Sequence, residues 1–227
     1  MEKLPRLTAE ERIKLIVDEG TFVECDINDA FVDPLKFPSY KEKILEEKAK
    51  TGLREAVITG TGEILGNCCK LIIMDSHYMM GTMGVVVGEK ICRIFEQATI
   101  ERLPVIAVVA SGGARVQEGI LSLVQMVKTS GVVYRHNERG LLYISVVTDP
   151  TMGGVAASFA SLADIIISEP EALYGFTGQK IIKETLNRSI PVDFQKAEQV
   201  IQNGLIDIIV ERERLKALLA TLLEWHK

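Results

Sequence analysis

Hydrophobic and polar positions at the start of the chain follow the period of amphipathic helices. A helix is predicted over residues 8–19, where Thr8 can cap the first turn and Glu11 can complete a capping box. Gly20 follows at the position where a glycine commonly ends a helix. After a polar loop that contains prolines, residues 40–50 predict a second, strongly charged helix whose charges fit a solvated face.

In the middle of the chain the pattern changes to short apolar runs separated by glycine-bearing loops. Residues 55–60 and 68–74 are rich in β-forming residues and predict a hairpin or meander. An apolar strand, a glycine-bearing loop and a helix then follow one another three times, over residues 68–99, 103–131 and 141–168. Strands that alternate with helices predict crossover connections and parallel pairing, and three such units in a row favour a spiral over a flat sheet.

The C-terminal part is more polar and mainly helical. A helix is predicted over residues 191–203, with Pro191 near its start and Gly204 just past its end. Leu205–Val210 predicts a short strand, and residues 211–225 predict a last helix with leucines on one face. No change in composition marks a second domain, so a single domain of residues 1–227 is expected. Its parts are a helical N-terminal extension (1–50), a spiral core (51–190) and a C-terminal helical segment (191–227).

Composition narrows the class of protein. The chain has 227 residues, of which 47% are hydrophobic and 25% charged, which suits one soluble α/β domain with a sizeable core. The net charge of -5 weighs against nucleic acid as the main partner. No apolar run approaches the roughly 20 residues of a membrane span, and the first residues lack the apolar stretch of a secretory signal. The four cysteines form no C-x-x-C pair, so reduced thiols in the cytoplasm are expected instead of a metal site.

Two loops are placed where chemistry is expected. Ser111–Arg115 (SGGAR) follows one apolar strand, and Thr148–Gly154 (TDPTMGG) follows the next. Each has a glycine pair where a strand passes into a helix, so the backbone can approach a ligand closely and the first helical amides are free to bind an anion. The alternative is that the glycines only permit tight turns. Two such loops at equivalent points of repeated units favour a functional role, whereas Gly81 in the first unit fits packing better.

Motifs for other chemistries are missing. The sequence has no phosphate-binding loop, no G-x-G-x-x-G after a strand and no G-x-S-x-G elbow. Ser111 has no evident base, and of the histidines only His77 lies near a candidate loop, while His136 and His226 are expected at the surface. The chain thus offers backbone donors and few catalytic side chains. That combination suits chemistry in which a cofactor or substrate supplies the base and the protein stabilises an enolate.

Three cations lie near these loops. Arg115 stands next to a helix start, where a positive charge is disfavoured, so it is expected to pair with Glu118 or with an anionic group of the substrate. Lys180 and Lys183 are either ligands for the phosphates of a small molecule or ordinary solvated lysines.

Long runs of the sequence resemble one family. The segments SGGARVQEGILSLVQMVKTS, YISVVTDPTMGGVAASFASLADIIISEPEALYGFTG and PVDFQKAEQVIQNGLIDIIVERERLKALLATLL are similar to the carboxyltransferase β subunit of bacterial acetyl-CoA carboxylase. The early segments DEGTFVE and FPSYKEKILEEKAKTGLREAVITGTG resemble it too, so the likeness covers nearly the whole chain.

This resemblance implies an α/β crotonase (ClpP-like) spiral of repeated ββα units, and a cytoplasmic subunit of fatty-acid biosynthesis. It implies an α-type partner subunit of the same fold, an active site between the two, and a hetero-tetramer with two copies of each. It also implies the reaction: carboxybiotin on a biotin carboxyl carrier protein releases its carboxyl group, the biotin ureido anion takes a proton from acetyl-CoA, and the thioester enolate attacks to give malonyl-CoA.

The resemblance also assigns residues. Backbone amides of Gly153 and Gly154 would form the main oxyanion hole, with Gly112, Gly113 and Ala114 contributing to a hole or to coenzyme A binding. Further substrate-binding positions would be Ala114, Arg115, Met152, Gly81, Phe176, Gly178 and Lys180.

Three departures from the family put the substrate in question more than the reaction class. The family's N-terminal four-cysteine zinc ribbon has no counterpart, so no zinc is expected; either the chain is shortened or it belongs to a form without zinc, as in polyketide or antibiotic synthesis. Met80 replaces a glycine of the family's Phe-Met-Gly-Gly loop, and Lys180 replaces an arginine, which loses bidentate pairing. Two alternatives remain: a malonate decarboxylase-type or other crotonase-like decarboxylase or hydratase, and a non-catalytic assembly subunit.

Overall fold

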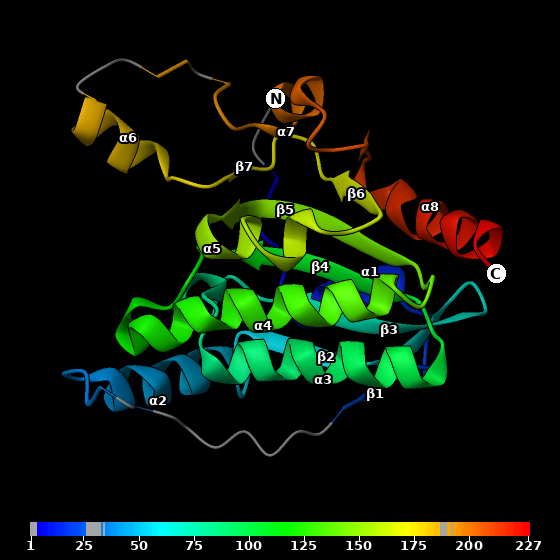
Figure 1. Ribbon diagram of the computed structural model, residues 1–227, viewed down its shortest axis with the longest axis horizontal. Helices are drawn as coiled ribbons and strands as arrows, with labels where there is room; N and C mark the ends of the chain where they lie inside the picture. Colours follow the sequence, from blue (N-terminus) through cyan, green and yellow to red (C-terminus); the bar gives the residue numbers. More distant parts are fainter. Residues whose placement is uncertain (1–3, 26–32, 34, 187–189, 192) are drawn as a thin grey trace.

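The computed structural model describes residues 4–25, 33, 35–186, 190–191 and 193–227. One sheet runs through the molecule in the order β1-β2-β3-β4-β5-β6-β8, with β7 paired to β5 (Figure 1). Strands β1, β2 and β3 pair antiparallel, and the pairs from β3 through β8 are parallel, as predicted. The strands are β1 Val23–Glu24, β2 Val57–Ile64, β3 Asn67–Met74, β4 Val105–Ser111, β5 Tyr143–Met152, β6 Ile165–Ser168, β7 Tyr174–Gly175 and β8 Ile208–Ile209.

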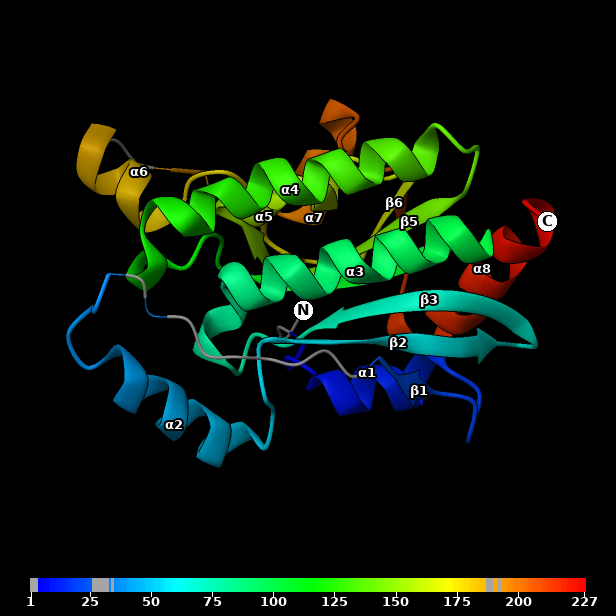
Figure 2. The ribbon, with the colours of Figure 1, turned by 60° about the horizontal axis from the view of Figure 1, so that its bottom comes forward.

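Helices cover both faces of the sheet. Figure 2 shows α3 and α4 on one side of β2 and β3, with α1 on the other. The α-helices are α1 Ala9–Ile16, α2 Tyr40–Thr51, α3 Val85–Glu101, α4 Ile120–Asn137, α5 Gly153–Ala156, α6 Gln179–Leu186, α7 Ala197–Val200 and α8 Arg212–Trp225. Short 3₁₀ helices are η1 Met79–Gly81, η2 Val116–Glu118, η3 Phe159–Ser161 and η4 Ile201–Asn203. None of the helices in the described ranges is long and apolar enough to cross a membrane.

Alternation along the strands divides the core into two layers. Val105, Ala107 and Val109 of β4 pack with α3 in one cluster, whereas Ile106 and Val108 pack with α1 and α8 in the other. Successive side chains of a strand point to opposite faces, so a continuous apolar run is what a strand covered on both faces requires.

The N-terminal predictions hold in part. The capping box of Thr8 and Glu11 is confirmed, but the first helix ends at Ile16, with extended backbone at Val17. Gly20 therefore does not end that helix; it lies in the following turn with φ +77°.

The hairpin of β2 and β3 also differs from its prediction. β2 continues to Ile64, so Gly60 and Gly62 lie inside the strand and the turn falls at Leu65–Gly66. At Gly60 a side chain would collide with Val23 of the edge strand β1, since an added Cβ would lie 2.5 Å from its carbonyl oxygen.

The helix predicted over 191–203 is wrong in its first half, of which residue 192 lies outside the described ranges. The helical part is α7 followed by η4, from Ala197 to Asn203. Gln195 has φ +66°, and its carbonyl accepts from Tyr174 in β7, so tertiary pairing replaces the helical turn there. The predicted strand Leu205–Val210 shrinks to β8.

Candidate active site at the two glycine loops

The two glycine loops meet at the carboxyl ends of neighbouring parallel strands. Ser111 at the end of β4 is in register with Thr151 of β5. Gly113 has φ +117° and Gly153 has φ +59°, and a Cβ added to either would lie 3.2 Å from the other's Cα. A side chain at either position would therefore be strained and would push the loops apart.

The amides of the first loop, Ser111–Arg115, are mostly engaged within the protein. Gly112 N donates to the Met80 carbonyl at 2.8 Å, and Gly113 N donates to Ser111 Oγ at 3.0 Å. Gly112 and Gly113 are therefore not free as oxyanion donors in this structure, and their predicted contribution to coenzyme A binding stays a prediction. Of the stretch Gly112–Ala114, only the Ala114 amide meets no acceptor among the described residues, and Ala114 lies against Gly154.

The second loop, Thr148–Gly154, places a helix start at the end of a strand. β5 ends at Met152, which caps the short helix α5, so the amides of Gly153 and Gly154 stand at a helix start without intrahelical acceptors. Thr148 and Thr151 both donate their hydroxyls to the Val109 carbonyl, at 2.8 and 3.0 Å, which fixes this loop to β4. A helix start at the end of a strand can stabilise a developing negative charge.

A third loop, η1, supports the first. A Cβ on Gly81 would overlap the Ala110 carbonyl oxygen, so close packing explains this glycine, as the packing interpretation expected. Met80, the residue that replaces the family's glycine, keeps a left-handed backbone with φ +56°. Its Cβ would lie 3.5 Å from a Cβ on Gly112, and its side chain is 45% exposed. Met80 thus covers the first glycine loop.

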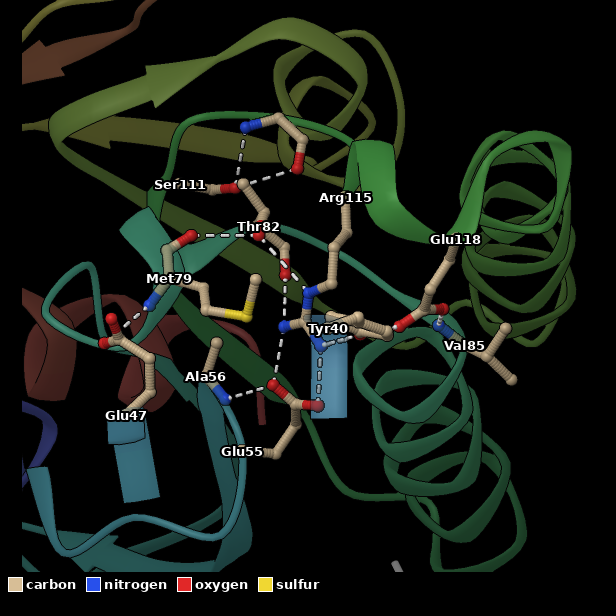
Figure 3. A network of polar contacts seen from close by, with 11 residues as sticks. Tyr40, Glu47, Glu55, Ala56, Met79, Thr82, Val85, Ser111, Arg115 and Glu118 are labelled. Atoms are coloured by element: carbon tan, nitrogen blue, oxygen red, sulfur yellow. Dashed lines mark hydrogen bonds and ion pairs between the residues drawn. The ribbon is translucent and has the colours of Figure 1, made fainter. Parts of the chain in front are cut away.

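Arg115 is buried and belongs to an internal network (Figure 3). Its Nη1 and Nη2 donate to the two carboxylate oxygens of Glu55 at 2.8 and 2.6 Å, and Nη1 also forms the predicted ion pair with Glu118, at 3.5 Å. Burial lowers the pKa of Arg115, but the negative charge of Glu55 outweighs it and raises that pKa overall. The guanidinium is therefore held by the protein, which favours the predicted ion pair within the chain over a contact with an anionic group of the substrate. Sequence reasoning missed Glu55 because it lies 60 residues away.

Of the remaining predicted positions, Met152 belongs to the second loop and Phe176 lies beside it. The Phe176 carbonyl would lie 3.8 Å from a Cβ on Gly153, and the Phe176 side chain is exposed. Gly178 has open space around it. Lys180 lies on α6, which projects from the body in Figure 1, but its side chain lies outside the described residues. Met152 is half-buried and directly precedes the open amides.

Among the histidines, the prediction for His136 is wrong. Its ring is buried, packs against Phe95 and lies 3.0 Å from Thr99 Oγ1, and burial lowers the pKa of this histidine. His77 lies 2.8 Å from the buried carboxylate of Asp75, behind η1. Within the described ranges, no three His, Cys, Asp or Glu side chains gather as a metal site.

Successive ββα units whose glycine loops converge at the ends of parallel strands define a protein of the crotonase fold. The sequence profile of the carboxyl transferase domain matches residues 3–225, so the chain belongs to the carboxyl transferase family. It is 52% identical over 221 residues to the acetyl-coenzyme A carboxylase carboxyl transferase subunit beta of Desulforamulus reducens, covering 97% of this chain and 77% of that relative. The resemblance noted in the sequence is thereby confirmed.

Solved structures show the same fold. Transcarboxylase 12S, solved with methylmalonyl-coenzyme A and methylmalonic acid bound, superposes with a TM-score of 0.82 at 27% identity. The match covers 96% of this chain and 41% of that one, so this chain spans less than half of the transcarboxylase. A Pseudomonas malonate decarboxylase hetero-dimer gives a TM-score of 0.74 at 20% identity, over 97% of this chain and 86% of that one, which shows the fold alone.

Proposed function

We propose that this chain is the β-type subunit of a biotin-dependent carboxyltransferase that carboxylates acetyl-CoA to malonyl-CoA in the cytoplasm. The observation that carries the proposal is the helix start at Gly153 and Gly154, held against the first glycine loop. Biotin on a biotin carboxyl carrier protein supplies the carboxyl group and the base. This chain needs neither a nucleophilic side chain nor a metal for that reaction.

The amides of Gly153 and Gly154, with Ala114 beside them, bind the thioester oxygen of the coenzyme A ester. That oxygen gains negative charge as the α-proton leaves, so preformed donors stabilise the transition state more than the ground state. Phe176, Gly178 and Met152 are the proposed substrate contacts beside these amides, and Lys180 on α6 is the proposed partner of the coenzyme A phosphates. Met80 over Gly112 narrows the acyl end of the site and favours a short acyl group.

An α-type subunit completes the site, in an assembly with two copies of each subunit. The support is an apolar face that begins directly after Arg115 and runs along α4. Val116 and Val127 are each 74% exposed and Ile120 is 65% exposed, which is unusual for a helix without a partner. The exposed apolar residues of this face are Val116, Ile120, Leu123, Val124, Val127 and Tyr134.

Carboxyl transfer from malonyl-CoA to biocytin tests the proposal. The chain is assayed alone and after mixing with the α-type subunit encoded in the same genome. Activity only in the mixture is the expected result. A folded, stoichiometric complex that transfers no carboxyl group would contradict the proposal and favour a non-catalytic assembly subunit.

A malonate decarboxylase-type activity is the second candidate, because open amides that hold a thioester enolate serve decarboxylation equally well. The assay separates the two. Loss of the carboxyl group from the malonyl thioester without biocytin, at a rate that biocytin does not change, would identify the decarboxylase.

A further inference from the structure

Building on that proposed function, we propose that Glu55 and Tyr40 are positioning residues that act on the active site through Arg115. Both come from segments before the second strand, far from the glycine loops in sequence. Their contacts fix the guanidinium of Arg115, and Arg115 in turn fixes the Ala114 amide beside the open donors of Gly153 and Gly154.

Both carboxylate oxygens of Glu55 are bound within the protein. Its side chain is 6% exposed, and both of its carboxylate oxygens accept from Arg115 in a bidentate pair. Glu55 Oε1 also accepts from the Ala56 amide at 2.7 Å, which fixes the carboxylate at the entry to β2. Such a fork fixes direction as well as distance, which a single hydrogen bond does not.

Arg115 binds the neighbouring residues Thr82 and Met83 through both its side chain and its backbone. Its Nη2 donates to the Thr82 carbonyl at 2.8 Å, and its backbone amide donates to the Met83 carbonyl at 3.0 Å. On the other side of Ala114, the Gly113 carbonyl accepts from the Met83 amide at 2.8 Å. Ala114 therefore stands between two neighbours that are both bound to Met83, and its own N–H is directed by them.

Tyr40 connects the same network to the start of α3. Its hydroxyl donates to Glu118 at 2.6 Å and accepts from Arg115 Nη1 at 3.3 Å. Glu118 also accepts from the Val85 amide at the first position of α3, at 2.5 Å. The network in Figure 3 thus joins α2, η1, α3 and the first glycine loop around one buried cation.

A second buried cluster gives a matched control. Glu169 also binds arginine, since Arg12 and Arg212 both donate to its carboxylate, and it is as buried as Glu55. That cluster joins α1, the end of β6 and α8. Removing the charge from Glu55 leaves Arg115 with Glu118 alone, at 3.5 Å, and removing it from Glu169 leaves Arg12 and Arg212 without their shared carboxylate, so both changes should destabilise the fold.

The experiment compares Glu55→Gln with Glu169→Gln in the complex with the α-type subunit, measuring kcat, KM and thermal stability. Glu55→Gln is expected to lower kcat about 10- to 100-fold with KM for malonyl-CoA changed less than about threefold, because small misplacements of a donor have effects of this size. Glu169→Gln is expected to lower the melting temperature comparably and to keep kcat within about twofold. Tyr40→Phe should give a smaller loss of kcat, and Glu55→Asp should restore part of it.

Hydrogen exchange of the peptide containing residues 112–116 gives a readout that needs no activity. Exchange should accelerate in Glu55→Gln and stay as in the unmodified chain in Glu169→Gln. Equal kcat losses in the two variants, or unchanged exchange in Glu55→Gln, would overturn the positioning role. An inactive unmodified complex would refute the proposed function instead, and the exchange data would still decide whether Glu55 positions the loop.

Discussion

The two glycine loops have nearly the same sequence setting and opposite use of their amides. Each follows an apolar strand and carries a glycine pair, yet Gly112 and Gly113 donate inward to Met80 and Ser111, whereas Gly153 and Gly154 begin α5, where a helix provides no acceptor for its first N–H groups. The first loop is fixed by contacts within the protein, and the second is the proposed donor. A glycine pair shows where a backbone approaches another group closely. Segments from elsewhere in the chain determine whether that group belongs to the protein or to a ligand.

Gly153→Val tests the donor loop and should have the largest effect. The new side chain meets Gly113 and forces φ +59° on a β-branched residue, so the amides turn away from the thioester oxygen. A fall in kcat of about 100- to 1000-fold is expected, the range for loss of an oxyanion donor. The complex with the α-type subunit should still form on gel filtration. Gly204→Asn, at another left-handed but open position, is the control; unchanged turnover in Gly153→Val would remove the oxyanion assignment.

Gly81→Ala tests whether the first glycine loop depends on close packing. An added methyl overlaps the Ala110 carbonyl at a position with φ +66°, so the free energy of unfolding should fall by about 2–5 kcal/mol. Gly66→Ala shares the positive φ but has open space, so it isolates the strain from the overlap. Urea unfolding measures both, and equal losses in the two variants would show that packing against Ala110 contributes nothing.

Ser111→Ala tests a hydrogen bond within the first glycine loop and should have a smaller effect than Gly81→Ala. Without the hydroxyl, the buried amide of Gly113 loses its acceptor, which costs about 1–3 kcal/mol. The Gly113 amide is then free to turn towards the ligand, and kcat should change by less than about tenfold. Enzyme assays and thermal melts report the two effects, and a loss of activity as large as in Gly153→Val would mean that Ser111 itself takes part in the chemistry.

Arg6→Ala should have the smallest effect. Arg6 Nε donates to Asp149 of the second loop at 3.2 Å, and its Nη1 lies 3.8 Å from Met80 Sδ, so it bridges the mouth of the site. A partly exposed ion pair of this kind contributes about 0.2–1 kcal/mol and weakens with salt. KM should rise up to about threefold at low salt and less at high salt. A salt-independent change would contradict an electrostatic bridge.

Local signals in the sequence predicted much of this fold. The capping box of Thr8 and the strand–loop–helix units depend on residues close together in the chain, and both are present. The same reasoning failed where distant residues decide. Glu55 is a second and closer partner of Arg115 beside the predicted Glu118, the core buries His136, and the pairing of Tyr174 with Gln195 replaces the start of the helix predicted over 191–203. The glycine loops could be located from sequence, but the direction of the Gly112 amide could not, because its acceptor Met80 lies in another unit.

The bidentate pair of Glu55 and Arg115 also restricts how this chain can be recombined with its relatives. A chimera that joins the N-terminal part of one homologue to the spiral core of another, at any crossover between residues 56 and 114, takes the carboxylate and the guanidinium from different parents. Such a hybrid inherits matched partners only if both parents use the same pair in the same geometry. Domain exchange to alter acyl specificity should therefore transfer residues 40–115 as one block.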